Sequence, residues 1–244
     1  MKRRNFIQKT SVTAFAMALT PSILIQEDIE YSISELMGKE DIQLYGKDIN
    51  LRKEAHDAFL DMKRAAYNDG IDLKIVSSYR NYERQRAIFE RKFITYTDDD
   101  GMAPMDAIEK IIEYSTIPGT SRHHWGTDID VLDGYRKVEG DVLVPHKYEG
   151  EGPYVDFKNW MDENSETYGF YLVYTDETKR RGFKYEPWHY SYAPLSIPML
   201  EQFRSKNIAS LLIREDFYGA EHFTMGFLRS YIQNNILDIN RDLL

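Results

Sequence analysis

Apolar residues recur along this chain at two spacings, one typical of helices and one typical of strands. From Leu51 the spacing is that of one helical face, and Asn50 is a candidate N-cap for this helix. Residues 71–77 alternate as a strand does, and Asn81 is a candidate N-cap for the helix that follows. Residues 103–114 predict a third helix.

The stretch GTDIDVL predicts a strand with two different faces. In strand geometry Ile129 and Val131 point to one side, while Asp128 and Asp130 point to the other. Because the apolar pair is expected to face the core, both aspartates share the face that would look into a site.

The last third of the chain predicts a hairpin and then helices. Residues 168–175 and 183–192 predict two strands, the second interrupted by Pro187. The basic residues 179–181 are expected at the solvated tip of this hairpin. Helical spacing returns in residues 194–244, which predicts a helical extension packed on the main domain.

Composition narrows the classes of function. Of the 244 residues, 42% are hydrophobic and 29% are charged, as in ordinary globular proteins. The net charge of −9 argues against a nucleic-acid-binding surface, which needs clustered Lys and Arg. The chain has no cysteine, so a metal site must use histidines and carboxylates.

Residues 1–25 have the pattern of an export signal. Basic residues near the start precede an uncharged run, residues 10–25, which is too short to span a membrane and contains Pro21. The sequence around Arg3 and Arg4 also resembles a twin-arginine signal. Removing four basic and no acidic residues changes the net charge from −9 to −13. We expect an exported protein of the periplasm or cell envelope with no stable membrane span after signal removal.

Candidate metal ligands gather in the stretch TSRHHWGTDID. Catalytic zinc typically takes three protein ligands from His, Asp and Glu and leaves one position for water. His123 or His124 and Asp128 or Asp130 supply two ligands from one segment, and His189 in EPWHY supplies a third from a distant one.

A candidate general base lies beside the third ligand. Glu186 is three residues before His189, where it can approach a metal-bound water without ligating the metal. The other histidines, His56, His146 and His222, are expected to be structural.

Three separate motifs together resemble a known family. SRHHWGTDID fits S-x-H-x-x-G-x-x-x-D, EPWHY fits E-P-W-H, and SSYRNYERQ fits S-x-Y-R followed by Gln five residues after the Arg. In this order they resemble the VanY-type D-alanyl-D-alanine carboxypeptidases of the LAS-type zinc peptidases. That wider group includes D,D-dipeptidases, L-alanyl-D-glutamate endopeptidases and, in structure, the sonic hedgehog signalling domain.

The resemblance implies an α+β fold in which a small central antiparallel sheet carries the zinc site and helices flank it. It covers residues 51–193, the expected zinc peptidase domain. Residues 1–25 are then the export signal, residues 26–50 a lead-in segment and residues 194–244 the C-terminal helical extension.

Carried over by position, the resemblance implies one Zn²⁺ ion bound by His123, Asp130 and His189. It makes Glu186 the catalytic base, and it places Arg80 where it binds the substrate and polarises its scissile carbonyl or terminal carboxylate.

The resemblance also implies that Gln85 and Ser121 shape the substrate pocket, and we expect the aromatic side chain of Trp188 in the pocket wall. Adjacent residues of an extended chain point to opposite sides, so His123 and His124 are not expected to bind the same ion. His124 is then expected in the pocket wall or beside a ligand.

Asp128 departs from the family, which usually has a small residue, often Ala, at this position. Three roles stay open. Asp128 can orient His189 or His124 by a hydrogen bond, as carboxylates do for zinc-bound imidazoles. It can form a salt bridge with Arg80 or another basic residue, or it can be a solvated carboxylate at the rim of the site.

The implied function is a zinc-dependent D,D-carboxypeptidase that removes the terminal D-alanine from peptidoglycan stem peptides ending in D-Ala-D-Ala. Zinc lowers the pKa of its bound water, and Glu186 takes the proton. The alternatives are a peptidoglycan endopeptidase of the same fold and a non-catalytic zinc-containing module that binds the wall or a partner. Retention of Glu186 beside a full ligand set argues against the non-catalytic module.

Overall fold

The computed structural model describes residues 30–244, so the predicted export signal lies outside the described residues. Within this described part, no helix is both long and apolar enough to cross a membrane.

The centre of the fold is a four-stranded sheet in the order β1-β2-β4-β3, with every neighbouring pair antiparallel. Its strands are β1 (Leu73–Ser77), β2 (Asp128–Asp133), β3 (Phe170–Leu172) and β4 (His189–Tyr192). The central strands β2 and β4 pair Asp130 with His189 and Asp128 with Ser191. Directly opposed residues of an antiparallel pair point to the same face, so these four side chains share one face of the sheet.

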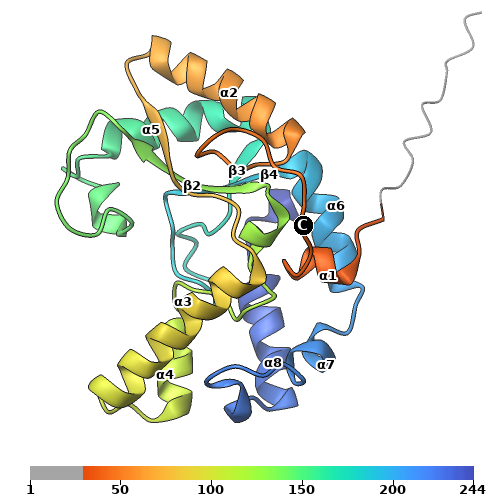
Figure 1. Ribbon diagram of the computed structural model, residues 1–244. Helices are drawn as coiled ribbons and strands as arrows, with labels where there is room; N and C mark the ends of the chain where they lie inside the picture. The colour runs from red at the N-terminus through yellow and green to blue at the C-terminus, as the bar shows by residue number, and fades with distance from the viewer. Residues whose placement is uncertain (1–29) are drawn as a thin grey trace, which may run out of the picture.

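Helices pack on both sides of this sheet (Figure 1). They are α1 (Ile33–Leu36), α2 (Lys53–Asn68), α3 (Tyr82–Ile94), α4 (Pro104–Ile111), α5 (Val155–Asn164), α6 (Ala193–Arg204), α7 (Ile208–Leu212) and α8 (Met225–Tyr231). Short 3-10 or π turns lie at Thr95–Asp99, Arg122–Trp125, Pro145–Lys147, Ser165–Tyr168, Ala220–His222, Ile232–Ile236 and Arg241–Leu243. This arrangement confirms the predicted α+β fold with a small antiparallel sheet.

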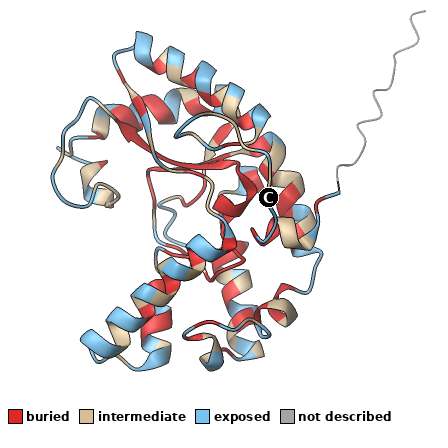
Figure 2. Cartoon of the chain, viewed as in Figure 1, coloured by how far each residue is buried: buried red, intermediate tan, exposed pale blue. Residues whose placement is uncertain are grey.

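The first hydrophobic core lies between the sheet and helices α2 and α5. Ile129 and Val131 of β2 are fully buried there with Phe59 of α2 and Phe157 of α5. In Figure 2 the buried colour follows the sheet and the inner sides of these helices, while the outer side of α2 is exposed. The predicted alternation of β2 is therefore confirmed, because its apolar residues face this core.

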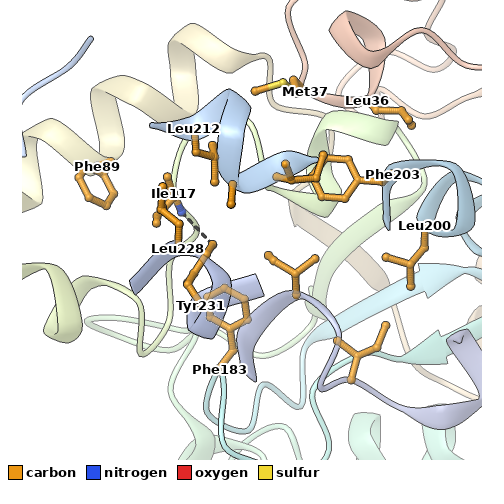
Figure 3. Close-up of a cluster of buried hydrophobic side chains, with 14 of the residues drawn as sticks. Leu36, Met37, Phe89, Ile117, Phe183, Leu200, Phe203, Leu212, Leu228 and Tyr231 are labelled. Carbon is orange, nitrogen blue, oxygen red and sulfur yellow. Dashed lines mark hydrogen bonds between the residues drawn. The ribbon is translucent and has the colours of Figure 1, made fainter. Parts of the chain in front are cut away.

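The second core joins the C-terminal helices to α3 and α4. Phe89 of α3, Phe203 of α6 and Leu228 of α8 are buried in one cluster (Figure 3). The Ile117 backbone N–H donates to the Tyr231 hydroxyl at 3.1 Å across this cluster. The C-terminal helices are thus packed on the main domain, as predicted, and they supply much of its second core.

Of the two predicted helix N-caps, Asn81 is confirmed and Asn50 is wrong. Asn81 caps α3 as predicted, because its side chain accepts a hydrogen bond from the Arg84 N–H at 2.9 Å. Asn50 does not cap α2, which begins at Lys53 after Arg52 in the N-cap position. Asn50 instead has a left-handed backbone with φ 52°, a conformation that Asn tolerates better than most residues.

The predicted hairpin was wrong in its extent. Residues 173–188, between β3 and β4, form an irregular connection whose Tyr174 and Phe183 are buried in the second core instead of continuing the strands. Arg180 is not at a solvated tip, because it donates to the backbone carbonyls of Thr175, Phe183 and Asp238. Burial of two aromatic side chains outweighs the strand preference of this segment.

We predict that Phe203→Ala destabilises the whole domain, since this ring is 1% exposed in the second core. Large-to-small changes at such positions cost about 3–5 kcal/mol. Urea unfolding should show one transition at a lower midpoint, with Tyr218→Ala, a residue 63% exposed, as the control. A second transition that Phe203→Ala alone shifts would mean that the C-terminal helices unfold independently.

Candidate metal centre and substrate cleft

Three buried side chains, two from one segment and one from a distant strand, converge on the sheet face that carries Asp130. His123, Asp130 and His189 each offer one ligand atom, and these atoms all lie within 4.8 Å of one another. Nε2 of His123 lies 3.4 Å from one carboxylate oxygen of Asp130, and Nδ1 of His189 lies 3.5 Å from the other. Of the candidates in TSRHHWGTDID, the structure therefore brings His123 and Asp130 together with His189.

His123 and His124 lie within one 3-10 turn, so the backbone between them is not extended. Residues Arg122–Trp125 form a single 3-10 turn, which ends at Gly126 with φ 68°. Nδ1 of His124 donates to the Arg80 carbonyl at 2.6 Å, and the Gly119 N–H donates to Nε2 of His124 at 3.2 Å. The predicted exclusion of His124 from the metal group holds, but its stated reason was wrong. His124 is absent from the cleft lining and instead supports the backbone behind it.

The donor atoms fit a zinc ion. Nδ1 of His123 donates to the Ser78 carbonyl at 2.7 Å, so its Nε2 keeps a free lone pair. That Nε2 and Oδ1 of Asp130 are both buried without a hydrogen-bond partner among the described residues. Two imidazoles and one carboxylate are a ligand set that catalytic zinc accepts, with one position left for water.

Asp128 is joined to the metal group through His189. Nε2 of His189 donates to Asp128 at 2.9 Å, which leaves Nδ1 of His189 facing Asp130. Asp128 also pairs with Nε of Arg122 at 3.0 Å and accepts a hydrogen bond from Ser191 at 2.6 Å. Of the three open roles, the contact with His189 and a salt bridge with a basic residue are both observed, and the basic residue is Arg122, not Arg80. The solvated carboxylate was wrong, since Asp128 is 0% exposed.

The charges of this group favour a cation. Burial opposes ionisation of Asp128, but Arg122 and the hydrogen bond from His189 hold the pKa of this carboxyl well below its usual range. Burial also disfavours a charged His189, yet its contacts with Asp128 and Glu186 and the charge of Asp130 raise the pKa of His189 to about 10. The same carboxylates favour any positive charge on or beside this imidazole, whether a proton or a metal ion.

Glu186 lies beside the metal group without belonging to it. A tight turn, in which the His189 N–H donates to the Glu186 carbonyl at 3.0 Å, brings its carboxylate to 3.0 Å from Nδ1 of His189. Burial raises the pKa of the Glu186 carboxyl above its usual range. A buried carboxyl with a raised pKa can both accept and return a proton.

These groups open into a cleft of about 440 Å³ that is lined by residues of the sheet, of α3 and of the loop after β2. Arg80, Ser121 and Trp188, all predicted for the pocket, line it together with Glu186. Gln85 does not line it; its side-chain oxygen accepts from Nη1 of Arg80 at 3.0 Å. Gln85 therefore contacts Arg80 and not the cleft itself.

Several lining residues were missed by the sequence analysis. Lys92 lies four residues after Ile88 on α3, and both line the cleft, so helical spacing could have found it. Arg122 falls inside the quoted motif, at a position that the pattern leaves unspecified. Asp141 comes from the loop between β2 and α5 and carries no local signal.

Comparison with curated proteins finds relatives that include two named as carboxypeptidases. The chain is 33% identical to the putative carboxypeptidase YodJ of Bacillus subtilis over 176 residues, which are 70% of this chain and 54% of that protein. It is 31% identical to a D-alanyl-D-alanine carboxypeptidase of Enterococcus faecalis over 134 residues, 54% of this chain and 44% of that protein. The chain thus spans about half the length of these two relatives.

Solved structures with the same fold carry related names. A glutamate-to-alanine mutant of the vancomycin resistance D,D-pentapeptidase VanY, in complex with Zn(II), matches with a TM-score of 0.51 and 25% identity, covering 66% of this chain and 84% of that one. VanYB in complex with D-alanine-D-alanine matches in fold with a TM-score of 0.52 and 24% identity, covering 73% of this chain and 92% of that one.

The family described as VanY, D-alanyl-D-alanine carboxypeptidase, matches residues 48–195, the stretch that holds Arg80, Glu186 and all three metal-site residues. Since this match covers more than half of the 244 residues, the chain belongs to the VanY family.

Proposed function

We propose that this protein is a zinc-dependent D,D-carboxypeptidase that removes the terminal D-alanine from peptidoglycan stem peptides. The observation that carries the proposal is the convergence of His123, Asp130 and His189 with Glu186 in one cleft. The names of the relatives, a D-alanyl-D-alanine carboxypeptidase and a VanY bound to D-alanine-D-alanine, suggest the substrate. A substrate in the cell wall agrees with the export predicted from residues 1–25.

The proposed reaction divides its work among a few groups. His123, Asp130 and His189 would hold the zinc ion, which when bound would act as a Lewis acid on water and on a carbonyl oxygen. Glu186 accepts the proton of the attacking water and later donates it to the departing amine. Arg80 places a fixed positive charge in the cleft, where it stabilises the negative oxygen that develops during attack. The terminal C–N bond breaks, and the products are D-alanine and the shortened peptide.

The ligand histidine is held for this task from its far side. Asp128 accepts the Nε2 proton of His189, which orients the ring and keeps the lone pair of Nδ1 directed at the metal group. Gln85 likewise holds Arg80, since its side-chain oxygen accepts a hydrogen bond from Nη1 of the arginine.

We predict that zinc-loaded protein releases D-alanine from a pentapeptide ending in D-Ala-D-Ala and that a chelator abolishes this release. Mass spectrometry of the products measures the bond that is cut. Release of a larger fragment would identify an endopeptidase, and cleavage that persists after chelation would contradict the zinc mechanism.

We predict that Glu186→Gln lowers kcat by about 100-fold to 10,000-fold, the usual range for loss of a general acid–base group. The amide keeps the shape of the side chain, so bound zinc should be retained. Glu151→Gln, on an exposed loop, is the matched control. Unchanged hydrolysis by Glu186→Gln would rule out this residue as the base.

We predict that His123→Ala loses its bound zinc and that zinc no longer raises its melting temperature. A ligand present at a hundred times its Kd stabilises the native state by about 2.7 kcal/mol, so the loss is measurable by thermal melting. His146→Ala, an exposed histidine outside the metal group, should respond to zinc as the unmodified protein does. Equal zinc content in the two variants would remove His123 from the ligand set.

A further inference from the structure

Arg122 has one hydrogen-bonding group left over on the wall of the substrate cleft. The side chain is 3% exposed and lines the cleft. Its Nε donates to Asp128 at 3.0 Å, and its Nη2 donates to Ser191 at 2.7 Å. Its Nη1 is buried and has no hydrogen-bond partner among the described residues.

The position of this guanidinium is fixed from behind. Asp128 and Ser191 hold two of its three nitrogens, and the Trp125 ring lies 4.8 Å from its central carbon. A guanidinium stays charged at all ordinary pH values and only donates hydrogen bonds. The direction in which Nη1 can donate a hydrogen bond is therefore fixed by the contacts of the other two nitrogens.

Other donors without partners line the same cleft. The hydroxyls of Thr116 and Ser121 and the Nε of Arg80 are also buried and unpaired among the described residues. A buried polar group without a partner costs about 1–3 kcal/mol, so several of them in one cavity indicate a polar ligand. Because all four groups can donate, the ligand that fits them best offers only acceptors, as a carboxylate does.

We propose that Arg122 binds the C-terminal carboxylate of the substrate through Nη1, and that Asp128 and Ser191 are the residues that position it. The proposal deepens the carboxypeptidase function and rests on it. In this assignment Arg80 is left to act on the scissile carbonyl. The assignment also explains why this chain has Asp128 where the family usually has a small residue. A small side chain at this position would leave Arg122 without its buried counter-charge.

The consequence is a preference for peptides with a free C-terminus. A carboxylate accepts a charge-assisted hydrogen bond from Nη1, whereas a C-terminal amide brings an NH₂ group that donates and carries no charge. Arg122 is therefore expected to distinguish an exopeptidase substrate from an internal peptide bond.

The test compares a pentapeptide ending in D-Ala-D-Ala with its C-terminal amide. Binding is measured by calorimetry on zinc-loaded Glu186→Gln protein, with and without Arg122→Gln. A hydrogen bond to a charged group contributes about 1.5–3 kcal/mol, so Arg122→Gln should weaken binding of the acid by about 10-fold to 150-fold. Binding of the amide should change much less, so the ratio of the affinity for the acid to the affinity for the amide should fall. With Glu186 present, the loss should appear in KM more than in kcat.

Lys92→Gln is the matched control, since Lys92 is another cation that lines the cleft. It should change the two affinities by similar factors and keep their ratio. Zinc content and melting temperature are measured for each variant. Should Arg122→Gln fail to fold because Asp128 is left as a buried unpaired charge, the double variant Arg122→Gln/Asp128→Asn removes both charges together.

An unchanged ratio of acid to amide affinity in a folded, zinc-loaded Arg122 variant would overturn the proposal, as would collapse of the ratio in Lys92→Gln alone. Failure of the proposed function is a different result. If the unmodified protein releases D-alanine but the ratio does not move, only the role of Arg122 is wrong. If it releases no D-alanine but Arg122→Gln lowers the ratio, the carboxylate site stands and the assigned reaction is wrong.

Discussion

The antiparallel register of β2 and β4 is the constraint on which the candidate site depends. It places Asp130 opposite His189 and Asp128 opposite Ser191, so four polar side chains meet on one face. A slip by one residue would turn this face into the core and send the apolar face to the cleft. The register is held because Ile129 is buried on the other side of the same strand. The hydrophobic core thus positions the proposed metal ligands Asp130 and His189 from the opposite face of the sheet.

Burying so much charge on one face requires that each group has a partner. Asp128 is satisfied by Arg122, Ser191 and His189, all nearly or fully buried. Replacing a buried ion pair by apolar residues is often neutral, whereas removing one partner costs about 3–5 kcal/mol. The pair of Arg122 and Asp128 is therefore better explained by the geometry it fixes than by the stability it adds.

The parts of the site that depend on local periodicity could be predicted from the sequence. The parts whose backbone conformation depends on contacts with distant residues could not. The shared face of Asp128 and Asp130 follows from the two-residue repeat of a strand, which any buried strand obeys. The course of the chain at His124 depends on a 3-10 turn and on hydrogen bonds to Arg80 and Gly119. No local pattern contains those partners. The predicted strand over residues 183–192 was too long for a similar reason, since its first residue, Phe183, is buried in the second core.

The cleft lies where the two hydrophobic cores of the fold meet, and this explains why its residues are so scattered in sequence. Asp130 and His189 belong to the sheet, which the first core supports, whereas Arg80 and Lys92 belong to the part built on the second core. The short turn that carries Arg122 and His123 connects the two parts, because His123 belongs to the metal group and Arg122 lines the cleft beside it. A change in how the two cores pack would then alter metal binding and peptide binding together. For this reason the C-terminal helices, which supply much of the second core without lining the cleft, are expected to be needed for the proposed activity.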